Sequence, residues 1–165
     1  MKKMITVLSL IVCFQANAQL KLVDGLYQFQ KVTEVQRTHA ELMEKGEAFV
    51  QQRADAYHEE VDRDGNSLST RIAAEFHSEI HQKTLYFTYT IEFGEGWYQE
   101  RVEGITIQIG DDIYQLEDAT LPDRTFAISE ASFVINMLSG SLISEMYSNM
   151  FSEQSSLVDA QFPRK

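Results

Sequence analysis

Cysteine and proline are both rare in this 165-residue chain. It has one cysteine, Cys13, and two prolines, Pro122 and Pro163. Disulfides often stabilise small extracellular domains, but a lone cysteine excludes any disulfide within the chain. The fold must therefore be stabilised by a hydrophobic core. The sequence also shows no internal repeat, low-complexity tract or linker-like stretch, so we expect one domain.

Basic residues are scarce as well. The chain contains 14 lysines and arginines against 25 aspartates and glutamates, which gives a formal net charge of −11. Binding to nucleic acid requires clustered Lys and Arg side chains. The sequence has no such cluster, so we do not expect a nucleic-acid partner. The charge permits a basic protein partner, and the alternative interpretation is that it only keeps an exported protein soluble.

The first 18 residues have the composition of a cleavable secretory signal peptide. Two lysines precede an apolar run at residues 4–14, and Ala16-Asn17-Ala18 supplies the small residues that a signal peptidase recognises. We predict cleavage after Ala18 and export to the periplasm or the extracellular space. The rest is predicted to form a single α+β domain over residues 19–151 and a polar tail over residues 152–165.

Two alternatives fit this N-terminus less well. A transmembrane anchor needs roughly 20 apolar residues, and the run at residues 4–14 is shorter. A lipoprotein signal needs a small residue before its cysteine, whereas Val12 precedes Cys13. We therefore expect no transmembrane segment in the mature chain. Cleavage would also remove the single cysteine, which favours a bacterial periplasmic or secreted protein.

Hydrophobic periodicity predicts a long N-terminal helix over residues 33–57. Apolar residues recur seven apart in two rows, at positions 35, 42 and 49 and at positions 43, 50 and 57, as expected for one buried helical face. Residues 21–30 are ambiguous and fit either a short strand or the lead-in to this helix. The turn-forming residues 62–66 should end the helical segment.

Alternating polar and apolar residues predict an antiparallel meander after this turn. Residues 68–81 alternate cleanly, although their four-residue spacing keeps a helix open. Residues 84–93 form the clearest strand, because β-branched and aromatic residues dominate them. Further strands are predicted at 98–109, at 113–116 after a tight turn, and at 125–128.

A second helix is predicted to begin at Ser129, with Gly140 as a kink or a break. The predicted fold class is therefore α+β. It has a long N-terminal helix, an antiparallel meander of four to five strands, and a C-terminal helix on the same sheet face.

Three side chains form the best metal-binding candidate. On a strand, His77, Glu79 and His81 would project from one face, and imidazole and carboxylate groups are common zinc ligands. His77 and His81 would then lie about 13 Å apart, too far to share one ion. On a helix they would form an i, i+4 pair that can bind one metal. The alternative that we favour is a solvated polar face.

Other patterns that suggest chemistry are incomplete. Residues 60–66 place acids at positions 1, 3 and 5 and glycine at position 6 of a calcium-binding loop, but position 12 is Arg71 instead of glutamate. The pairs Asp111/Asp112 and Glu117/Asp118 are interpreted as turn and edge charges. After cleavage the chain has no cysteine nucleophile, and it has no Gly-x-Ser-x-Gly motif. We therefore assign no catalytic residue and no cofactor.

The C-terminal helix is rich in Met and Phe, which we interpret mainly as core. An alternative is an apolar pocket between sheet and helix, because methionine suits adaptable binding surfaces. The candidate ligand-binding residues are Phe87, Tyr89, Met137, Met146 and Met150.

Three functional hypotheses follow. The favoured one is an exported, non-enzymatic interaction or accessory protein, such as an inhibitor or immunity protein that binds a basic partner. The second is a protein that binds a small apolar ligand. The third is a metal-dependent enzyme that uses His77, Glu79 and His81.

Overall fold

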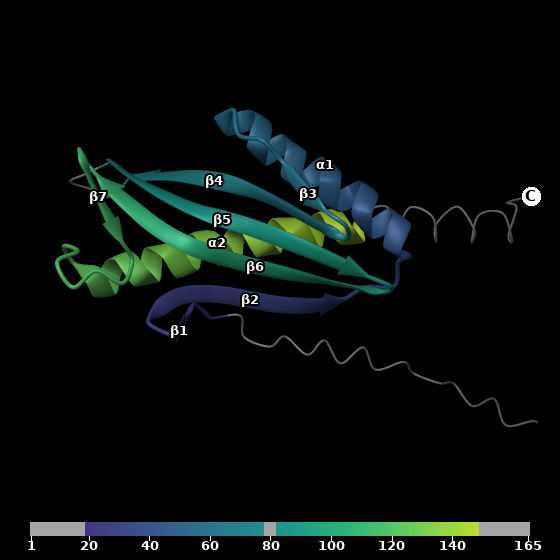
Figure 1. Cartoon of the computed structure of the whole chain (residues 1–165), viewed down its shortest axis with the longest axis horizontal. Coiled ribbons are helices and arrows are strands. Elements are labelled where there is room, and N and C mark those ends of the chain that lie inside the picture. The colour runs from purple at the N-terminus through teal and green to yellow at the C-terminus, as the bar shows by residue number, and fades with distance from the viewer. Residues whose placement is uncertain (1–18, 78–81, 149–165) are drawn as a thin grey trace, which may run out of the picture.

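The computed structural model describes residues 19–77 and 82–148. Within these two ranges the chain forms seven strands and two helices (Figure 1). In chain order they are β1 (Lys21–Val23), β2 (Leu26–Glu34), α1 (His39–Tyr57), β3 (Asp62–Asp64), β4 (Ser67–His77), β5 (Gln82–Gly94), β6 (Trp97–Ile109), β7 (Asp112–Gln115) and α2 (Arg124–Tyr147).

All described strands join one antiparallel sheet in the order β1-β2-β6-β5-β4-β3, and β7 also pairs with β6. Consecutive strands β4, β5, β6 and β7 form a meander, as the alternation predicted. The β1–β2 hairpin returns to the other side of this meander and pairs with the first half of β6. The predictions of an α+β class and an antiparallel sheet are therefore confirmed, but the predicted number of four to five strands is wrong, because seven described strands join the sheet.

The prediction of a long helix at the start of the fold is wrong. Two strands precede α1, and α1 begins at His39 instead of residue 33. Thr38 caps the helix, because its hydroxyl accepts the Glu41 N–H while the Glu41 carboxylate accepts the Thr38 N–H. Val35, which began one of the seven-residue rows, is buried just after β2 and outside the helix. The seven-residue spacing therefore did not distinguish a buried residue that follows a strand from buried residues of the helix itself.

Two further predicted boundaries are also wrong. The short strand expected at residues 125–128 is the first turn of α2, which begins at Arg124. The Phe126 and Ala127 N–H groups donate to the Asp123 carbonyl, so the chain is already helical there. The helix also continues through Gly140 to Tyr147. By contrast, β4 is a strand and pairs with β5 up to His77, as favoured over a helix.

One face of the sheet carries the core. The odd-numbered residues of β5 from Leu85 to Phe93 are at most 1% exposed, and both helices bury side chains in the same cluster. On β6 the buried positions are even before Gly104 and odd after it. Gly104 has φ +63 and lies at a register shift opposite Phe87, so a bulge at this glycine changes the parity of β6.

The C-terminal end of α2 is fixed to the N-terminal part of the fold. The Arg37 guanidinium donates to the carbonyls of Met146 and Ser148 at 2.6 and 2.7 Å. Lys45 donates to the Glu145 carbonyl and to the Ser148 hydroxyl. These cations satisfy the free carbonyls of the last turn and face the negative end of the helix dipole. The apolar N-terminal half of α2 extends away from this attachment.

Candidate functional site

The helix α2 is apolar on its outer side as well as on its inner side. Ala131, Ile135 and Leu142 are buried in the core, whereas Phe126, Phe133 and Met137 are 56%, 66% and 59% exposed. By length and hydropathy α2 would suit a membrane span, but its inner side packs on the sheet. A surface helix normally presents polar residues to water. Exposed apolar residues at one place indicate an interaction site.

A groove of about 570 Å³ lies beside this outer side of α2. We call it the α1–α2 groove. Its lining comes from the end of α1, from β4 and β5, and from the middle of α2: Arg53, Tyr57, Ile72, Ala73, Ala74, Glu75, Phe87, Glu130, Phe133, Val134, Met137, Leu138 and Ser141. Small-molecule sites typically have volumes of about 300–1,000 Å³ and mostly apolar linings.

The sequence explains why the fold is hollow here. The helix α1 ends at Tyr57, and His58 adopts a left-handed conformation that terminates it. Beyond that point α1 no longer covers the sheet. Ala73 and Ala74 of β4 are too small to fill the space that remains next to α2. The ring of Phe87, which is 1% exposed, and Ile72 contribute to the lining from the sheet.

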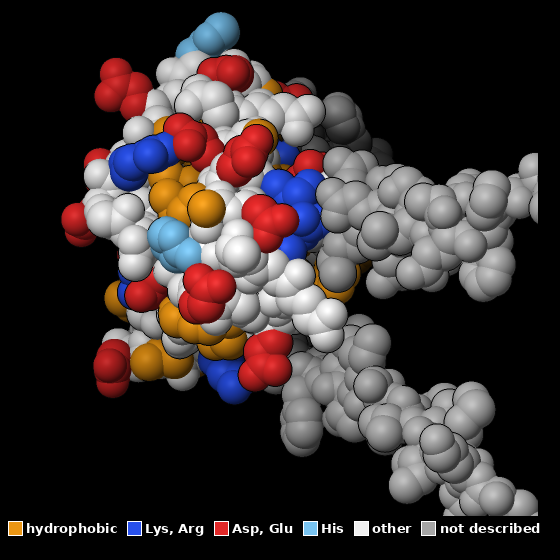
Figure 2. Space-filling model, turned by 90° about the vertical axis from the view of Figure 1, so that its right-hand side faces the viewer, with side chains coloured by type: hydrophobic (Ala, Val, Ile, Leu, Met, Phe, Trp, Pro, Cys, Tyr) orange, Lys and Arg blue, Asp and Glu red, His pale blue; other side chains and the backbone are white. Residues whose placement is uncertain are grey.

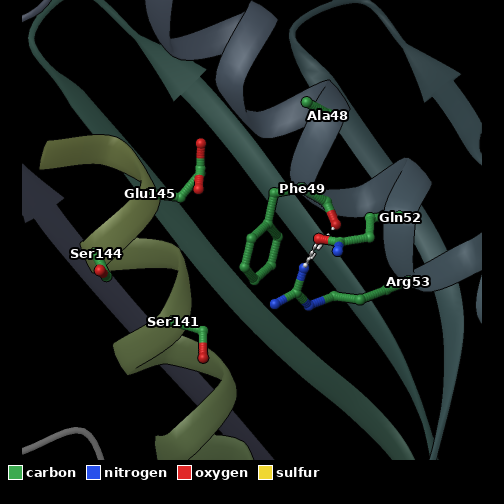
Figure 3. A pocket seen from close by; sticks show the side chains of 7 residues that line it. All are labelled: Ala48, Phe49, Gln52, Arg53, Ser141, Ser144 and Glu145. Carbon is green, nitrogen blue, oxygen red and sulfur yellow. Dashed lines mark hydrogen bonds between the residues drawn. The ribbon is translucent and has the colours of Figure 1, made fainter. Parts of the chain in front are cut away.

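A second hollow of about 350 Å³ lies next to the first, between α1 and α2. Figure 3 shows its lining residues: Ala48, Phe49, Gln52, Arg53, Ser141, Ser144 and Glu145. Arg53 and Ser141 line both hollows, so the two are adjacent. Small serines on α2 face the polar side chains of α1 here. The combined cleft is therefore apolar at one end and polar at the other.

Arg53 lies where the two hollows meet. Its guanidinium carbon is 3.3 Å from the centre of the Phe49 ring, and its Nη1 donates to the Phe49 carbonyl at 3.0 Å. Burial lowers the pKa of Arg53, while Tyr89 and Glu145 act in the opposite direction. An arginine stays charged throughout the physiological range. Among the described residues, no salt bridge involves Arg53.

A buried polar cluster lies between the sheet and α2. The Glu100 side chain is fully buried and accepts hydrogen bonds from the Tyr89 hydroxyl and the Ser139 hydroxyl, each at 2.7 Å. The Lys31 ammonium donates to the Ser139 oxygen at 3.0 Å. Burial raises the pKa of Glu100, and the two hydroxyls and Lys31 partly oppose this effect. The cluster joins β2, β5, β6 and α2.

Glu100 was missed as an interior residue in the sequence analysis, although a signal was present. Tyr98, Glu100 and Val102 alternate along one face of β6, and this parity places the carboxylate inward with two buried neighbours. Arg53 lies outside the two apolar rows of the predicted helix and was not identified as a site residue. No local pattern indicates that α2 lies beside it, because α1 and α2 are separated by five strands.

The structure divides the predicted ligand-binding residues among three places. Phe87 and Met137 both line the α1–α2 groove. Tyr89 belongs to the buried polar cluster, and Met146 is 0% exposed in the core. Met150 lies outside the described residues. Of the four candidates within the described residues, Phe87 and Met137 line this groove, and Tyr89 and Met146 are not among its lining residues.

The predicted metal ligands fall at the edge of the described region. His77 is the last residue of β4 and pairs with Gln82, whereas Glu79 and His81 lie outside the described residues. The zinc hypothesis thus stays a prediction. Within residues 19–77 and 82–148, no group of three His, Cys, Asp or Glu side chains is arranged to hold a metal ion.

The other acidic patterns lie in turns and edges. Asp62 and Asp64 belong to β3, which forms a hairpin with β4. Asp112 is the first residue of β7 and pairs with Ile109 across the turn. The Asp118 carboxylate accepts the Thr120 N–H and hydroxyl, and these hydrogen bonds lower the pKa of Asp118. Asp118 therefore has a structural role in its turn.

Comparison with known proteins identifies the fold alone. No family model and no curated protein matches the chain. Among solved structures, a TBP-like protein from Parabacteroides distasonis matches with a TM-score of 0.70 and 12% identity, over 78% of this chain and 97% of that one. A DUF4468 family protein from Bacteroides ovatus matches with a TM-score of 0.61 and 11% identity, over 78% and 90% of the two chains. The chain therefore shares its fold with these bacterial proteins.

Proposed function

We propose that this chain is an exported, non-enzymatic accessory protein that binds an apolar ligand in the α1–α2 groove. The observation that carries the proposal is the groove of about 570 Å³ next to Phe133 and Met137, which are 66% and 59% exposed. Covering apolar surface of this kind stabilises a complex by about 25 cal/mol for each Å² removed from water. The volume and the mostly apolar lining of the groove support this proposal.

The rim of the groove is held in place by a partly buried ion pair. The Lys83 ammonium lies 2.9 Å from the Glu130 carboxylate, and both side chains are at most 15% exposed. Glu130 is therefore engaged in fixing α2 to β5. This contact supports a preformed groove, and preformed sites bind without the cost of ordering their walls.

The basic protein partner expected from the net charge has less support from geometry. Acidic side chains are spread over the face shown in Figure 2, between apolar and basic ones, and they do not gather at one place. On this face the acidic charge therefore favours no particular docking surface. A basic partner remains a prediction from composition, whereas the α1–α2 groove supports the proposal of an apolar ligand.

The proposal is tested by titrating the full chain with a neutral apolar fluorophore, N-phenyl-1-naphthylamine. We expect saturable binding that weakens about tenfold in Met137→Asp and in Phe133→Asp, because a charge next to the ligand disfavours apolar contact. The matched control is Ile113→Asp on β7, where the native side chain is 65% exposed and outside the groove. This variant should bind like the wild type.

Two outcomes would contradict the proposal. One is no saturable binding to the wild type. The other is equal weakening in Ile113→Asp and in the two groove variants, which would place the fluorophore elsewhere. Circular dichroism of each variant verifies that the fold is retained.

A further inference from the structure

The cleft between α1 and α2 is apolar at one end and polar at the other, which matches the two ends of an amphiphilic ligand. Its larger part is lined mainly by apolar side chains, including Ile72, Phe87 and Val134. Its smaller part is lined by Gln52, Ser141, Ser144 and other mostly polar side chains. Arg53 stands at the boundary. A ligand that follows this cleft would place an apolar chain in the larger part and a polar head at Arg53.

The Arg53 guanidinium is available for such a head group. Figure 3 shows it directed from α1 across the gap toward α2, whereas the Glu145 carboxylate points away from it. Its Nη1 bonds within its own helix, to the Phe49 carbonyl and to the Gln52 side chain. A guanidinium has five N–H donors in a planar fork, so further donors remain for a ligand.

The chemistry around Arg53 favours one carboxylate. A guanidinium matches the two oxygens of a carboxylate with two parallel hydrogen bonds. The carboxylates of Glu145 and Glu75, which also line the cleft, disfavour a head group that carries more than one negative charge. A cationic head is disfavoured by Arg53 itself.

We propose that the α1–α2 groove binds a single-chain fatty acid, with its carboxylate on Arg53 and its acyl chain in the apolar part of the groove. This inference rests on the proposed function and specifies the class of its ligand. The half-buried position of Arg53 strengthens the pair, because a charge-assisted hydrogen bond is less screened there than in water. The preference for a carboxylate head group over an uncharged one is therefore attributed to the Arg53 side chain.

The test compares three ligands with the same twelve-carbon chain. Laurate, dodecanol and dodecyltrimethylammonium are titrated against the full chain loaded with N-phenyl-1-naphthylamine, and displacement of the fluorophore is measured. We expect laurate to displace it at about tenfold lower concentration than dodecanol, as expected for one hydrogen-bonded charge pair. Dodecyltrimethylammonium should be the weakest competitor.

Variants assign the preference to Arg53. Arg53→Gln should lose the preference for laurate over dodecanol, measured as the ratio of the two displacing concentrations within the same variant. Arg53→Met, which keeps an apolar stem next to Phe49, serves the same purpose if the glutamine variant does not fold. The matched control is Arg71→Gln, which removes the same charge at an exposed position outside the groove. It should keep the preference.

The outcomes separate this inference from the proposed function. Saturable fluorophore binding with equal displacement by laurate and dodecanol would overturn the fatty-acid assignment and leave the apolar site standing. A preference that survives in both Arg53 variants would also overturn it. Tighter displacement by an apolar peptide with a free C-terminal carboxylate would assign the groove to a peptide instead. Absence of fluorophore binding would overturn the proposed function itself.

Discussion

Glu100 places a carboxyl group inside the core, and its neighbours decide how it titrates. Tyr89 and Ser139 donate to it, Lys31 lies next to Ser139, and Tyr98 adjoins it on β6. Burial is the largest effect and raises the pKa of Glu100 above its ordinary value. An acid whose pKa is raised on folding binds its proton more tightly in the folded state. Its contribution to stability is therefore complete below the pKa in the unfolded chain and is lost as the pH rises through the pKa in the folded state.

This sign gives a prediction for Glu100→Gln. The variant cannot titrate at this position, so the wild type should gain stability relative to it as the pH falls from 8 to 5. The measurement is the free energy of unfolding in urea at several pH values for both proteins. The control is Glu103→Gln on the same strand, where the native side chain is 45% exposed. A difference between wild type and Glu100→Gln that stays constant with pH would contradict the prediction.

The burial of a single residue could be predicted where it follows from the local sequence pattern. It was missed where it depends on packing against an element far away in the sequence. The alternation on β5 correctly indicates the buried row that contains Phe87 and Phe93. The parity change at Gly104 was not predicted, because a bulge depends on how β6 pairs with β5. Arg53 acquires its place in the cleft only when α2 packs beside α1. Local periodicity contains no information on that packing.

At the scale of elements, the two helix glycines differ in what surrounds them. A Cβ at Gly46 of α1 would overlap the ring of Phe93, whereas a Cβ at Gly140 of α2 has nothing within 4 Å. Alanine is favoured over glycine by about 1 kcal/mol in a helix interior. The absence of a side chain at Gly46 therefore allows α1 to approach β5 closely. Gly140 has no such packing constraint.

This difference predicts opposite effects for the same substitution. Gly140→Ala should raise the free energy of unfolding by about 0.5–1 kcal/mol, because only the helix propensity changes. Gly46→Ala should lower it by about 1–3 kcal/mol, because the methyl group forces α1 away from the Phe93 ring. Urea unfolding of both variants measures the two effects. Stabilisation by Gly46→Ala would show that α1 does not pack this closely.

The start of α1 was mispredicted although its capping signal is local. Thr38 and Glu41 have the spacing of a capping box, which indicates a helix beginning after residue 38. The seven-residue rows were given more weight and extended the helix back to residue 33. The strand β2 was obscured because its inward face mixes Phe29 with Lys31, whose ammonium reaches the buried polar cluster. A polar residue on the core face weakens the alternation that marks a strand.

At the scale of the whole molecule, the meander was predictable and the placement of β2 was not. Consecutive strands joined by short turns usually pair with each other, which gives β4 to β7 directly. The pairing of β2 with β6 joins segments such as Phe29 and Val102 that lie far apart in the sequence. That pairing, together with the long connection through α1, brings Lys31 to the buried cluster. The buried polar cluster thus depends on the part of the topology that local sequence patterns cannot predict.

Export is the remaining prediction about the whole chain, and residues 1–18, on which it depends, lie outside the described residues. Every described strand begins after Ala18, so cleavage there would leave all of them intact. We expect protein from the periplasmic or culture fraction to begin at Gln19, as measured by N-terminal sequencing and intact mass. Ala18→Leu should block cleavage, because the signal peptidase requires a small residue there. The matched control, Ala40→Leu within α1, should leave processing unchanged, and a cytoplasmic protein that retains Met1 to Ala18 would refute the export of this chain.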